Sequence, residues 1–447
     1  MKHQKVVVIG LDCAPPKLVF ELWKDKLPNI SNIIDRATWG PLRSCTPPIT
    51  VPAWMCMMTG KDPGRLGIYG FRERQGNSYT KSQIANSSYI KEKTIWDLLG
   101  KKGRKSIILG VPPTYPPRKI HGILITDFLT PSIEHTYTYP ESIMTEIKKV
   151  VGDYLLDTKF RIEDRNNLLK EIIKMTNKRF ELAKYLLEKK PWDFFMMVEI
   201  GVDRMQHAYW KYFDKDHRGY RAGNSFETAL FRYYQLIDEK IGEVLKIIPK
   251  DTVVFIVSDH GAKKMDGAFC INEWLIKEKY LVLKKYPKKI SSLEELEIDW
   301  GKTKAWAWGG YYSRVFLNLK GRDPQGTINK KNFHREREIL QKKLLNITDE
   351  KGKKLQNLVE PPEKLYKTVN GNPSDLFAIF GDLSWRAAGT IGHKTEWILD
   401  NDTGPDDAVH DWNGIFIKSD PQNPKKQYKK NMNIYDVFPM IRKELNI

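Results

Sequence analysis

Short runs of apolar residues, many of them β-branched, are the strongest pattern in this chain. Such residues dominate segments 5–11, 192–200 and 252–257, which is typical of strands buried on both faces of a sheet. Longer amphipathic segments lie between these runs and predict helices at 140–151, 162–189, 224–247 and 434–445. This alternation predicts an α/β fold, in which a mostly parallel central sheet has helices on both faces.

Weaker patterns extend this core. Short strands are expected at 42–45, 105–110, 122–126, 374–380 and 414–417. Pro15 and Pro16 fit the first turn of a helix that continues to Trp23, and another helix is expected at 51–58, closed by the glycines of segment 60–64.

The composition of the chain changes after Leu283. Residues 284–367 are rich in Lys and Glu, and their charged helices flank one strand-like segment at 311–319. We expect an inserted cap at 284–367, with residues 1–283 and 368–447 forming the core. The aromatic residues of segment 305–312 would then stack on a bound group or form the cap's own core.

Composition limits the class of protein further. Hydrophobic residues make up 41% of the 447 positions, enough for a large core, and no run reaches the roughly 18 apolar residues of a membrane span. No signal peptide is evident, because Asp12 interrupts the first apolar run. The four cysteines show no CxxC spacing and are expected to be reduced thiols. These features predict a soluble, cytoplasmic protein.

The formal net charge of +19 has two interpretations. The positive charge either attracts an anionic partner, such as a phosphate ester, a nucleotide or a membrane surface, or belongs to a solvated Lys-rich surface. No zinc-finger spacing, RNA-recognition motif or basic repeat indicates a nucleic-acid partner. The chain also lacks a P-loop and a GxGxxG motif, so nothing in it favours an ATPase or a Rossmann dehydrogenase.

Metal-binding residue types follow the three strongest predicted strands. Asp12 follows the first, Asp203 and His207 follow the second, and Asp259 and His260 follow the third. The carboxyl ends of parallel strands meet at one edge of a sheet, so these side chains are expected to converge. For each pair alone, a polar turn or a structural histidine is the preferred explanation, but the recurrence at three strand ends favours a metal site. Mixed carboxylate and imidazole ligands suit Zn²⁺, Mn²⁺ or Fe better than Ca²⁺ or Mg²⁺.

A threonine precedes the predicted helix at 51–58. Thr50 lies at or near the helix N-terminus, where main-chain N–H groups and the helix dipole favour an anion. A metal bound to its hydroxyl would favour the ionised, nucleophilic form. Thr46 competes for this role, and a simple helix cap is the structural alternative.

Together these segments resemble the alkaline phosphatase superfamily. Their order and type are closest to its type I phosphodiesterase / nucleotide pyrophosphatase branch, and in particular to microbial members described as predicted phosphohydrolases or phosphomutases. The motifs span nearly the whole chain. In chain order they are Gly10-Leu-Asp12, Thr50-Val-Pro52 with Met58-Thr-Gly60, Asp203-x-x-x-His207, Ser258-Asp-His-Gly261 and His410.

The resemblance implies an alkaline-phosphatase-like fold and a metal-dependent phosphohydrolase that acts on a small-molecule phosphodiester or phosphomonoester. The core would be catalytic, and the cap at 284–367 would set substrate specificity. Two divalent ions are implied, with Zn²⁺ preferred and Mn²⁺ as the alternative. Thr50 would be phosphorylated, and water activated at the second metal would then hydrolyse the phosphothreonine. The implied ligands are Asp12, Thr50, Asp259 and His260 for one ion, and Asp203, His207 and His410 for the other.

Two of the implied assignments are less direct. His410 is preferred to His393 as the last metal ligand, because it follows an acidic loop and precedes a strand. Nucleotide pyrophosphatases have an Asn about twenty residues after the nucleophile, but this chain has none in that region. Phosphate binding is therefore expected from Tyr69, Arg72 or Arg74, since a guanidinium suits phosphate oxygens.

Several alternatives remain open from the sequence. A phosphonate hydrolase, a sulfatase or a phosphomutase would use the same scaffold, although a threonine nucleophile argues mildly against the last two. From a different class, a basic protein that binds nucleic acid or a membrane surface has only the net charge in its favour. A structural protein with a vestigial site would bind little metal.

Overall fold

The computed structural model describes residues 4–447, which form two compact units. The first unit takes residues 4–71, 85–263 and 410–447, and the second takes 72–84 and 264–409. The second unit therefore contains the expected insertion at 284–367 but extends beyond it on both sides and adds a separate hairpin. Lys/Glu-rich composition marks only the charged part of this unit, because the unit also contains apolar strands at 305–308 and 376–379.

A large, mostly parallel sheet forms the centre of the first unit, as predicted. Its strand order is β20-β2-β19-β9-β1-β8-β5-β6-β7, with β21 beside β2. The parallel centre consists of β1 (Val6–Leu11), β8 (Phe194–Glu199), β9 (Val253–Val257), β5 (Ser106–Leu109) and β6 (Gly122–Ile125). The flanking strands are β2 (Ala37–Arg43), β7 (Thr138–Tyr139), β19 (Asn413–Ser419), β20 (Gln427–Tyr428) and β21 (Met432–Asn433), of which β19 is antiparallel to β9.

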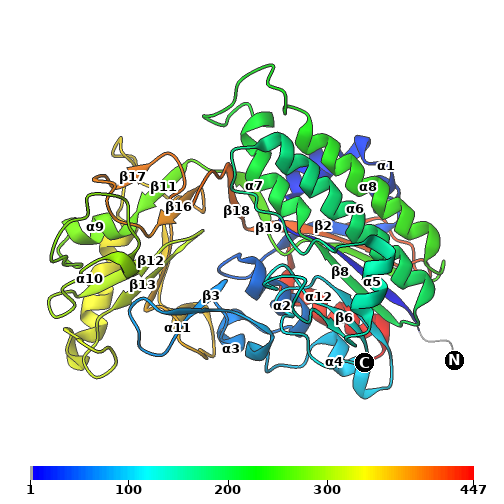
Figure 1. Cartoon of the computed structure of the whole chain (residues 1–447), viewed down its shortest axis with the longest axis horizontal. Helices are drawn as coiled ribbons and strands as arrows, with labels where there is room; N and C mark the ends of the chain where they lie inside the picture. Colours follow the sequence, from blue (N-terminus) through cyan, green and yellow to red (C-terminus); the bar gives the residue numbers. More distant parts are fainter. Residues whose placement is uncertain (1–3) are drawn as a thin grey trace. The chain divides into compact units, whose positions relative to one another are not determined.

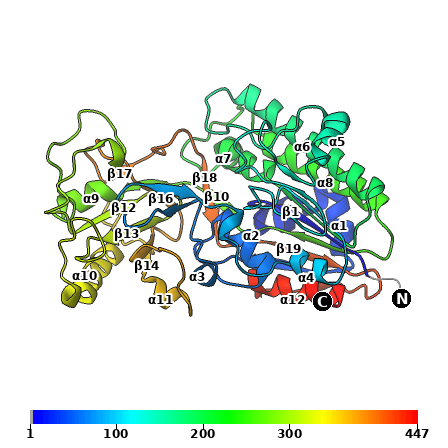
Figure 2. The ribbon, with the colours of Figure 1, turned by 60° about the horizontal axis from the view of Figure 1, so that its bottom comes forward.

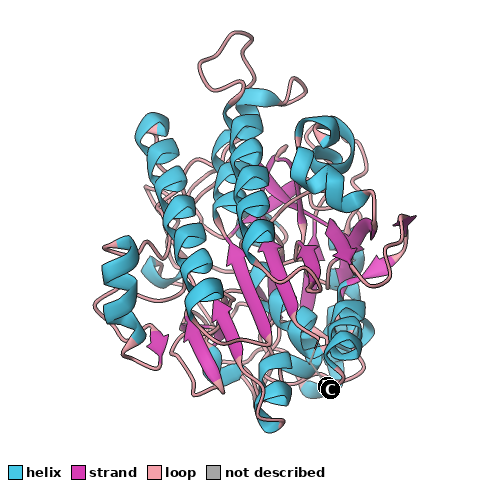
Figure 3. Cartoon of the chain, turned by 90° about the vertical axis from the view of Figure 1, so that its right-hand side faces the viewer, coloured by secondary structure: helices cyan, strands magenta, loops and turns pink. Residues whose placement is uncertain are grey.

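Helices cover both faces of this sheet, which confirms the predicted α/β fold (Figures 1 and 3). Alternate residues of the central strands, such as Val6 and Val8, pack in one core with the helices of one face. These helices are α2 (Thr50–Thr59), α4 (Ile95–Lys101) and α12 (Ile434–Leu445). The helices of the other layer are α6 (Arg165–Lys189), α7 (Gly201–Phe213) and α8 (Ala229–Ile247), and α1 (Pro28–Ile34), α3 (Pro63–Leu66) and α5 (Ile143–Val151) are also in this unit. The helix predicted after Asp12 is a short π-helical segment, Lys17–Leu22.

Strand register aligns the ends of the three central strands. Leu11 of β1 pairs with Glu199 of β8, and Gly10 pairs with Val257 of β9. Each strand is thus followed at the same edge by one of the polar segments identified in the sequence.

The second unit has its own core and smaller sheets. Helices α9 (Ile271–Lys277) and α10 (Phe333–Leu345) pack beside its four-stranded sheet, and α11 (Pro362–Leu365) follows β14 (Figure 2). The four-stranded sheet has the order β12 (Ala305–Trp308), β13 (Ser313–Leu317), β15 (Leu376–Ile379) and β14 (Leu358–Glu360). The other strands of this unit are β16 (Trp385–Ala388), β11 (Gly267–Cys270) and β17 (Trp397–Ile398), and the hairpin β3 (Arg72–Arg74) with β4 (Ser82–Ile84).

Strand β15 corrects one sequence prediction. Segment 374–380 was expected to return to the central sheet, but β15 pairs with β13 and β14 in the second unit. A short apolar run predicts a buried strand but carries no information about which sheet it joins. The boundary between the units falls within β10 (Gly261–Lys264) and β18 (Ala408–Asp411), which form a two-stranded sheet. Within residues 4–447, none of the helices combines the length and apolar character needed to cross a bilayer.

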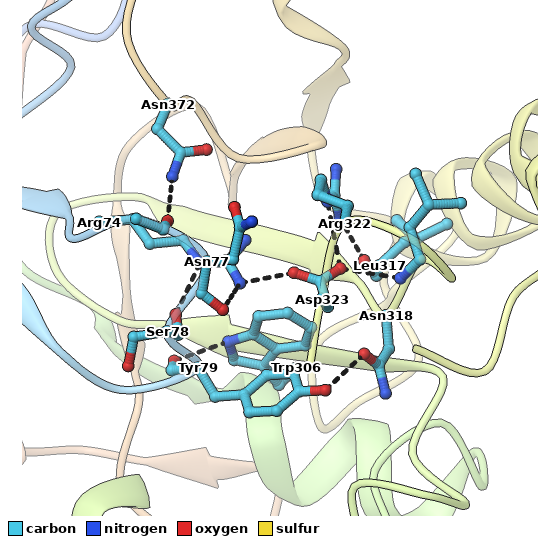
Figure 4. Close-up of polar contacts among 12 residues, drawn as sticks. Arg74, Asn77, Ser78, Tyr79, Trp306, Leu317, Asn318, Arg322, Asp323 and Asn372 are labelled. Carbon is cyan, nitrogen blue, oxygen red and sulfur yellow. Dashed lines mark hydrogen bonds and ion pairs between the residues drawn. The ribbon is translucent and has the colours of Figure 1, made fainter. Parts of the chain in front are cut away.

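Arg74 is part of the internal structure of the second unit. Its guanidinium donates to Asp323 Oδ1 at 2.6 Å and to the main-chain oxygens of Asn77 and Ser78 (Figure 4). Both side chains of the ion pair are almost fully buried, with 1% and 0% exposed. Because these bonds use the guanidinium internally, we do not include Arg74 among the proposed substrate-binding residues.

We expect Arg74→Met to lower the free energy of unfolding of the second unit by about 3–5 kcal/mol, because it leaves the Asp323 carboxylate buried without its partner. Equilibrium urea unfolding measures this change. Arg65→Met is the matched control, since the Arg65–Glu92 pair is exposed and should contribute at most about 1 kcal/mol. Equal effects of the two substitutions would contradict the structural role of Arg74.

Candidate active site

The structure brings seven of the predicted site residues together at one edge of the central sheet. All of them belong to the first unit, and none is more than 3% exposed. They are Asp12, Thr50, Asp203, His207, Asp259, His260 and His410.

One half of this site surrounds the imidazole of His260. Its Nε2 atom lies 3.2 Å from Asp259 Oδ2, 3.7 Å from Asp12 Oδ1 and 3.1 Å from Thr50 Oγ1. Thr50 is the first residue of α2, and Ile49 is the helix cap. The Thr50 hydroxyl therefore lies at a helix N-terminus and within reach of two carboxylates and an imidazole.

Neighbouring groups orient the two carboxylates. The indole N–H of Trp54 donates to Asp12 Oδ2 at 2.7 Å, and the Cys13 N–H donates to Asp259 Oδ1 at 3.3 Å. Gly10 makes room for this indole, because a Cβ atom there would lie 2.4 Å from the Trp54 ring. Each carboxylate thus has one oxygen held by the protein and the other directed toward the site.

The remaining oxygens fit a metal ion. Asp12 Oδ1 and Asp259 Oδ2 are buried and have no hydrogen-bond partner. Asp12, Asp259 and His260 form a group in which one ligand atom of each residue lies within 4.8 Å of the others. Buried carboxylate oxygens normally have hydrogen-bond or metal partners, so this donor set suits a divalent cation.

The other half of the site is built around Asp203 and two histidines. Asp203 Oδ1 lies 3.2 Å from His207 Nε2 and 4.0 Å from His410 Nε2. The rings of His260 and His410 are stacked with centroids 3.8 Å apart. Asp203 forms ligand-type groups within 4.8 Å both with His260 and His410 and with His207 and Cys13. Cys13, which follows Asp12 directly, was not predicted as a site residue.

The tautomers of two histidines follow from their partners. His260 Nδ1 lies 3.0 Å from the Gly261 carbonyl oxygen, and His410 Nδ1 lies 2.7 Å from the Pro48 carbonyl oxygen. A carbonyl oxygen only accepts, so each Nδ1 carries the proton and each Nε2 is left with its lone pair. This arrangement presents Nε2 to a metal and fixes the ring orientation.

Burial and mutual repulsion set the charges of the site. Burial raises the pKa of the Asp12 carboxyl well above its usual value, and the charge of Asp203 adds to this shift. Burial and the charge of Asp12 likewise raise the pKa of Asp259. Burial lowers the pKa of His260 to about 4 and that of His410 well below its usual value, so both rings are neutral at pH 7. These two neutral rings do not offset the charge of ionised Asp12 and Asp259, and a divalent ion would supply positive charge beside them.

Asp203 differs from the other two carboxylates because it has a cationic neighbour. Burial opposes its ionisation, but His207 and Arg204 outweigh this effect and hold the pKa of Asp203 well below its usual value. The Arg204 guanidinium donates to Asp203 Oδ2 at 2.6 Å and forms two further bonds with Asp157, at 2.8 and 2.7 Å. Arg204 therefore fixes one oxygen of Asp203 and leaves the other facing the two histidines.

We expect Arg204→Met to lower the free energy of unfolding of the chelator-treated protein by about 3–5 kcal/mol, because it leaves Asp203 buried without its guanidinium partner. Urea denaturation measures this loss. Arg232→Met on α8 is the control, because Arg232 is exposed and its removal should change stability by no more than about 0.5 kcal/mol. A loss no larger than that of the control would show that the Asp157–Arg204–Asp203 contacts do not stabilise the fold.

Tyr69 and Arg72 are the other two predicted residues. Tyr69 is fully buried in the first unit, and Arg72 lines a cavity of the second unit. Sequence reasoning also missed supporting residues, namely Cys13, Ser44, Trp54, Arg204 and Ser258. Three of the five, Cys13, Arg204 and Ser258, are each next to a predicted metal ligand in the sequence. Trp54 follows Thr50 by one helical turn. This closeness to predicted site residues was the signal that could have identified the four. Ser44, which donates to the Asp259 carbonyl oxygen, gives no such signal.

A family model described as type I phosphodiesterase / nucleotide pyrophosphatase matches residues 6–412. The chain belongs to this family. The matched range includes all seven clustered residues and confirms the resemblance noted in the sequence. Membership in this family makes the chain a phosphoric ester hydrolase, and the clustered acidic and histidine side chains agree with the metal dependence of the family. A search of curated proteins found no match.

Several solved structures are similar to this chain in fold. Human ectonucleotide pyrophosphatase / phosphodiesterase 5 is 15% identical, with a TM-score of 0.59 over 99% of this chain and 95% of that chain. Phosphonoacetate hydrolase from Sinorhizobium meliloti 1021, in complex with phosphonoacetate, is 13% identical, with a TM-score of 0.62 over 99% and 96%. An inactive threonine-to-alanine variant of the murine phosphodiesterase, in complex with AMP, is 13% identical, with a TM-score of 0.58 over 99% and 95%.

Proposed function

We propose that this enzyme hydrolyses a small-molecule phosphate ester through a phosphothreonine intermediate at Thr50. The observation that carries the proposal is the position of the Thr50 hydroxyl, 3.1 Å from His260 Nε2 and at the N-terminus of α2. The inactive threonine-to-alanine variant of the murine relative supports a threonine at the reacting position. This position favours Thr50 over Thr46 as the nucleophile.

The proposed metal ligands follow the two halves of the site. Asp12, Thr50, Asp259 and His260 would hold one divalent ion, and Asp203, His207 and His410 would hold a second. When bound, the ions would supply positive charge that favours the ionised Thr50 hydroxyl and neutralises phosphoryl oxygens. The mixed nitrogen and oxygen donors favour Zn²⁺, with Mn²⁺ as the alternative.

The protein's own groups determine how the ester is attacked. The main-chain N–H groups of Thr50 and Val51 lie in the first turn of α2, where they and the helix dipole are suited to phosphoryl oxygens. Thr50 Oγ1 forms a bond to phosphorus as the bond from phosphorus to the leaving alcohol oxygen breaks. Water then attacks phosphorus, releases phosphate or a phosphomonoester and restores the Thr50 hydroxyl. This route divides one displacement into two easier ones.

Substrate binding, domain roles and location complete the proposal. Tyr69 and Arg72 remain proposed substrate-binding residues, and the second unit is proposed to set specificity. A cytoplasmic location is proposed because the four cysteines are buried and form no disulfide. A phosphonate hydrolase is the second candidate, favoured by the structural likeness to phosphonoacetate hydrolase.

Hydrolysis of four chromogenic esters tests the proposal. The substrates are p-nitrophenyl phosphate, bis-p-nitrophenyl phosphate, p-nitrophenyl phenylphosphonate and p-nitrophenyl sulfate. The protein is treated with chelator and then resupplied with Zn²⁺ or Mn²⁺. We expect metal-restored hydrolysis of a phosphate ester, with little activity on the sulfate. A preference for the phosphonate ester would favour the second candidate, and no metal-restored activity on any ester would overturn both.

A further inference from the structure

The second unit contains a cavity of about 290 Å³ whose lining residues all belong to that unit. One wall is the β3–β4 hairpin, with Arg72 and Ser82. The other walls include Trp308 of β12, Arg314 of β13 and Arg386 of β16. The volume is close to the lower end of the range of small-molecule sites, about 300 Å³.

Buried contacts hold the hairpin wall of this cavity in place. The Arg74–Asp323 ion pair anchors one end, and the Tyr79 hydroxyl donates to Asn318 Oδ1 at 2.9 Å (Figure 4). The indole N–H groups of Trp306 and Trp308 both donate to the Tyr79 carbonyl oxygen, at 3.1 and 3.3 Å. The wall is therefore formed before any ligand binds, which reduces the entropy lost on binding.

Three arginine side chains, those of Arg72, Arg314 and Arg386, line the cavity. Arg386 is 4% exposed, and one of its amino groups donates to Asp406 at 2.9 Å, but its buried Nε atom has no hydrogen-bond partner. Arg314 donates to the main-chain oxygen of Arg72, which links β13 to the hairpin wall. Glu73 is the carboxylate that pairs with Arg314, at 3.9 Å. These guanidinium groups suit the planar oxygens of an oxyanion.

Two acidic residues line the cavity, but they do not cancel its preference for an anion. Asp402 Oδ2 already accepts hydrogen bonds from the Gly389 and Thr390 N–H groups and from the Thr390 hydroxyl. Glu294 is exposed on a short 3-10 turn. The Asp402 carboxylate oxygen thus fixes the loop after β16. The groups that could donate hydrogen bonds to a bound anion are mainly the arginine side chains.

An aromatic surface lies beside the arginines. Trp308 is only partly buried and lines the cavity, whereas Trp306 of the same strand is fully buried. The Arg314 guanidinium lies 4.9 Å from the Trp308 ring centroid. A flat apolar group can pack beside these planar groups while its charged end reaches a guanidinium.

We propose that this cavity binds a small organic anion in which a flat apolar group carries a carboxylate or a phosphate. The proposal goes beyond the hydrolase activity and shares with it only Arg72, which is also a proposed substrate-binding residue, so Arg314→Gln is the variant specific to the cavity. Binding can be measured in metal-free protein, where divalent ions cannot hold an anion at the candidate active site.

Isothermal titration of the chelator-treated, full-length protein tests the proposal. The probes are benzoate, phenylphosphonate and the uncharged benzyl alcohol. We expect saturable binding of one or both anions at a single site, and binding of benzyl alcohol weaker by about tenfold or more. The stronger of the two anions identifies a carboxylate or a phosphate ligand.

Variants locate the binding site. Arg72→Gln and Arg314→Gln should each weaken binding of the preferred anion about tenfold or more, whereas Arg335→Gln on α10 should leave it unchanged. Arg335 is exposed and does not line the cavity, so it controls for the change in net charge. Arg72 is also exposed, so its substitution should not disturb folding. No saturable binding, equal binding of benzyl alcohol, or an equal loss in Arg335→Gln would overturn the proposal.

Discussion

Replacing Thr50 by alanine is expected to lower turnover of the preferred ester by about a thousandfold or more, while the protein stays folded and binds metal. Thr50 is 2% exposed, and its hydroxyl makes one contact with His260, so its loss should cost only about 1 kcal/mol of stability. The large effect on rate and the small effect on stability follow from the same geometry. The hydroxyl is placed for bond formation and contributes little to packing.

Steady-state kinetics, circular dichroism and elemental analysis of the same preparations measure the turnover, the folding and the metal content of the variant. Thr50→Ser retains a hydroxyl and should keep measurable activity, and Thr46→Ala should resemble the unmodified protein. Mass spectrometry of acid-quenched reactions should find one phosphoryl group on the peptide that contains Thr50. Substantial activity of Thr50→Ala, or loss of activity in Thr46→Ala instead, would assign the nucleophile elsewhere.

The second large effect is expected for Asp259→Asn, which removes a proposed metal ligand. Metal affinity should fall by more than about a hundredfold, because even substitutions of groups that only support a ligand cost about 10–100-fold. Activity should fall with it. Elemental analysis after dialysis against a metal buffer measures the bound ion, and the exposed Asp25→Asn is the control. An unchanged metal content would rule out Asp259 as a ligand.

The Asp259→Asn substitution should change the melting temperature in opposite directions in chelator-treated and in metal-loaded protein. In chelator-treated protein, Asp259 is a buried carboxyl near Asp12, so the neutral amide should not lower the melting temperature and is expected to raise it. In metal-loaded protein the variant should melt at a lower temperature, because it loses the stabilisation that a bound ion gives to the native state. A lower melting temperature of the variant in both states would indicate a structural role for Asp259.

The sequence was sufficient to predict the central sheet and its edge. Asp12, Asp203 and Asp259 follow strands whose apolar runs are unmistakable, and parallel strands bring their carboxyl ends together. The sequence could not predict that Arg74 pairs with Asp323, 249 positions away, because one arginine near a predicted active site has the same local context whether it binds substrate or a distant carboxylate.

The sequence also could not predict which sheet a given strand joins. The runs at 376–379 and 415–417 are both apolar, yet β15 lies in the second unit and β19 in the central sheet. Pairing partners are set by tertiary packing rather than by the composition of a short strand. Cys13 was missed for a related reason, since its contact with Asp203 and His207 depends on how β1 and α7 are placed in the fold.

The stacked rings of His260 and His410 have a consequence for the polymer chain itself. These residues are 150 positions apart, and the long segment 264–409 begins just after one and ends just before the other. The two ions proposed for this site, one at His260 and one at His410, would together act as a reversible cross-link between the two ends of that segment. For a closed loop of this length, the lost freedom of the unfolded chain corresponds to about 5 kcal/mol. The length and sequence of the enclosed segment can therefore change without altering the spacing of the two imidazoles that close it.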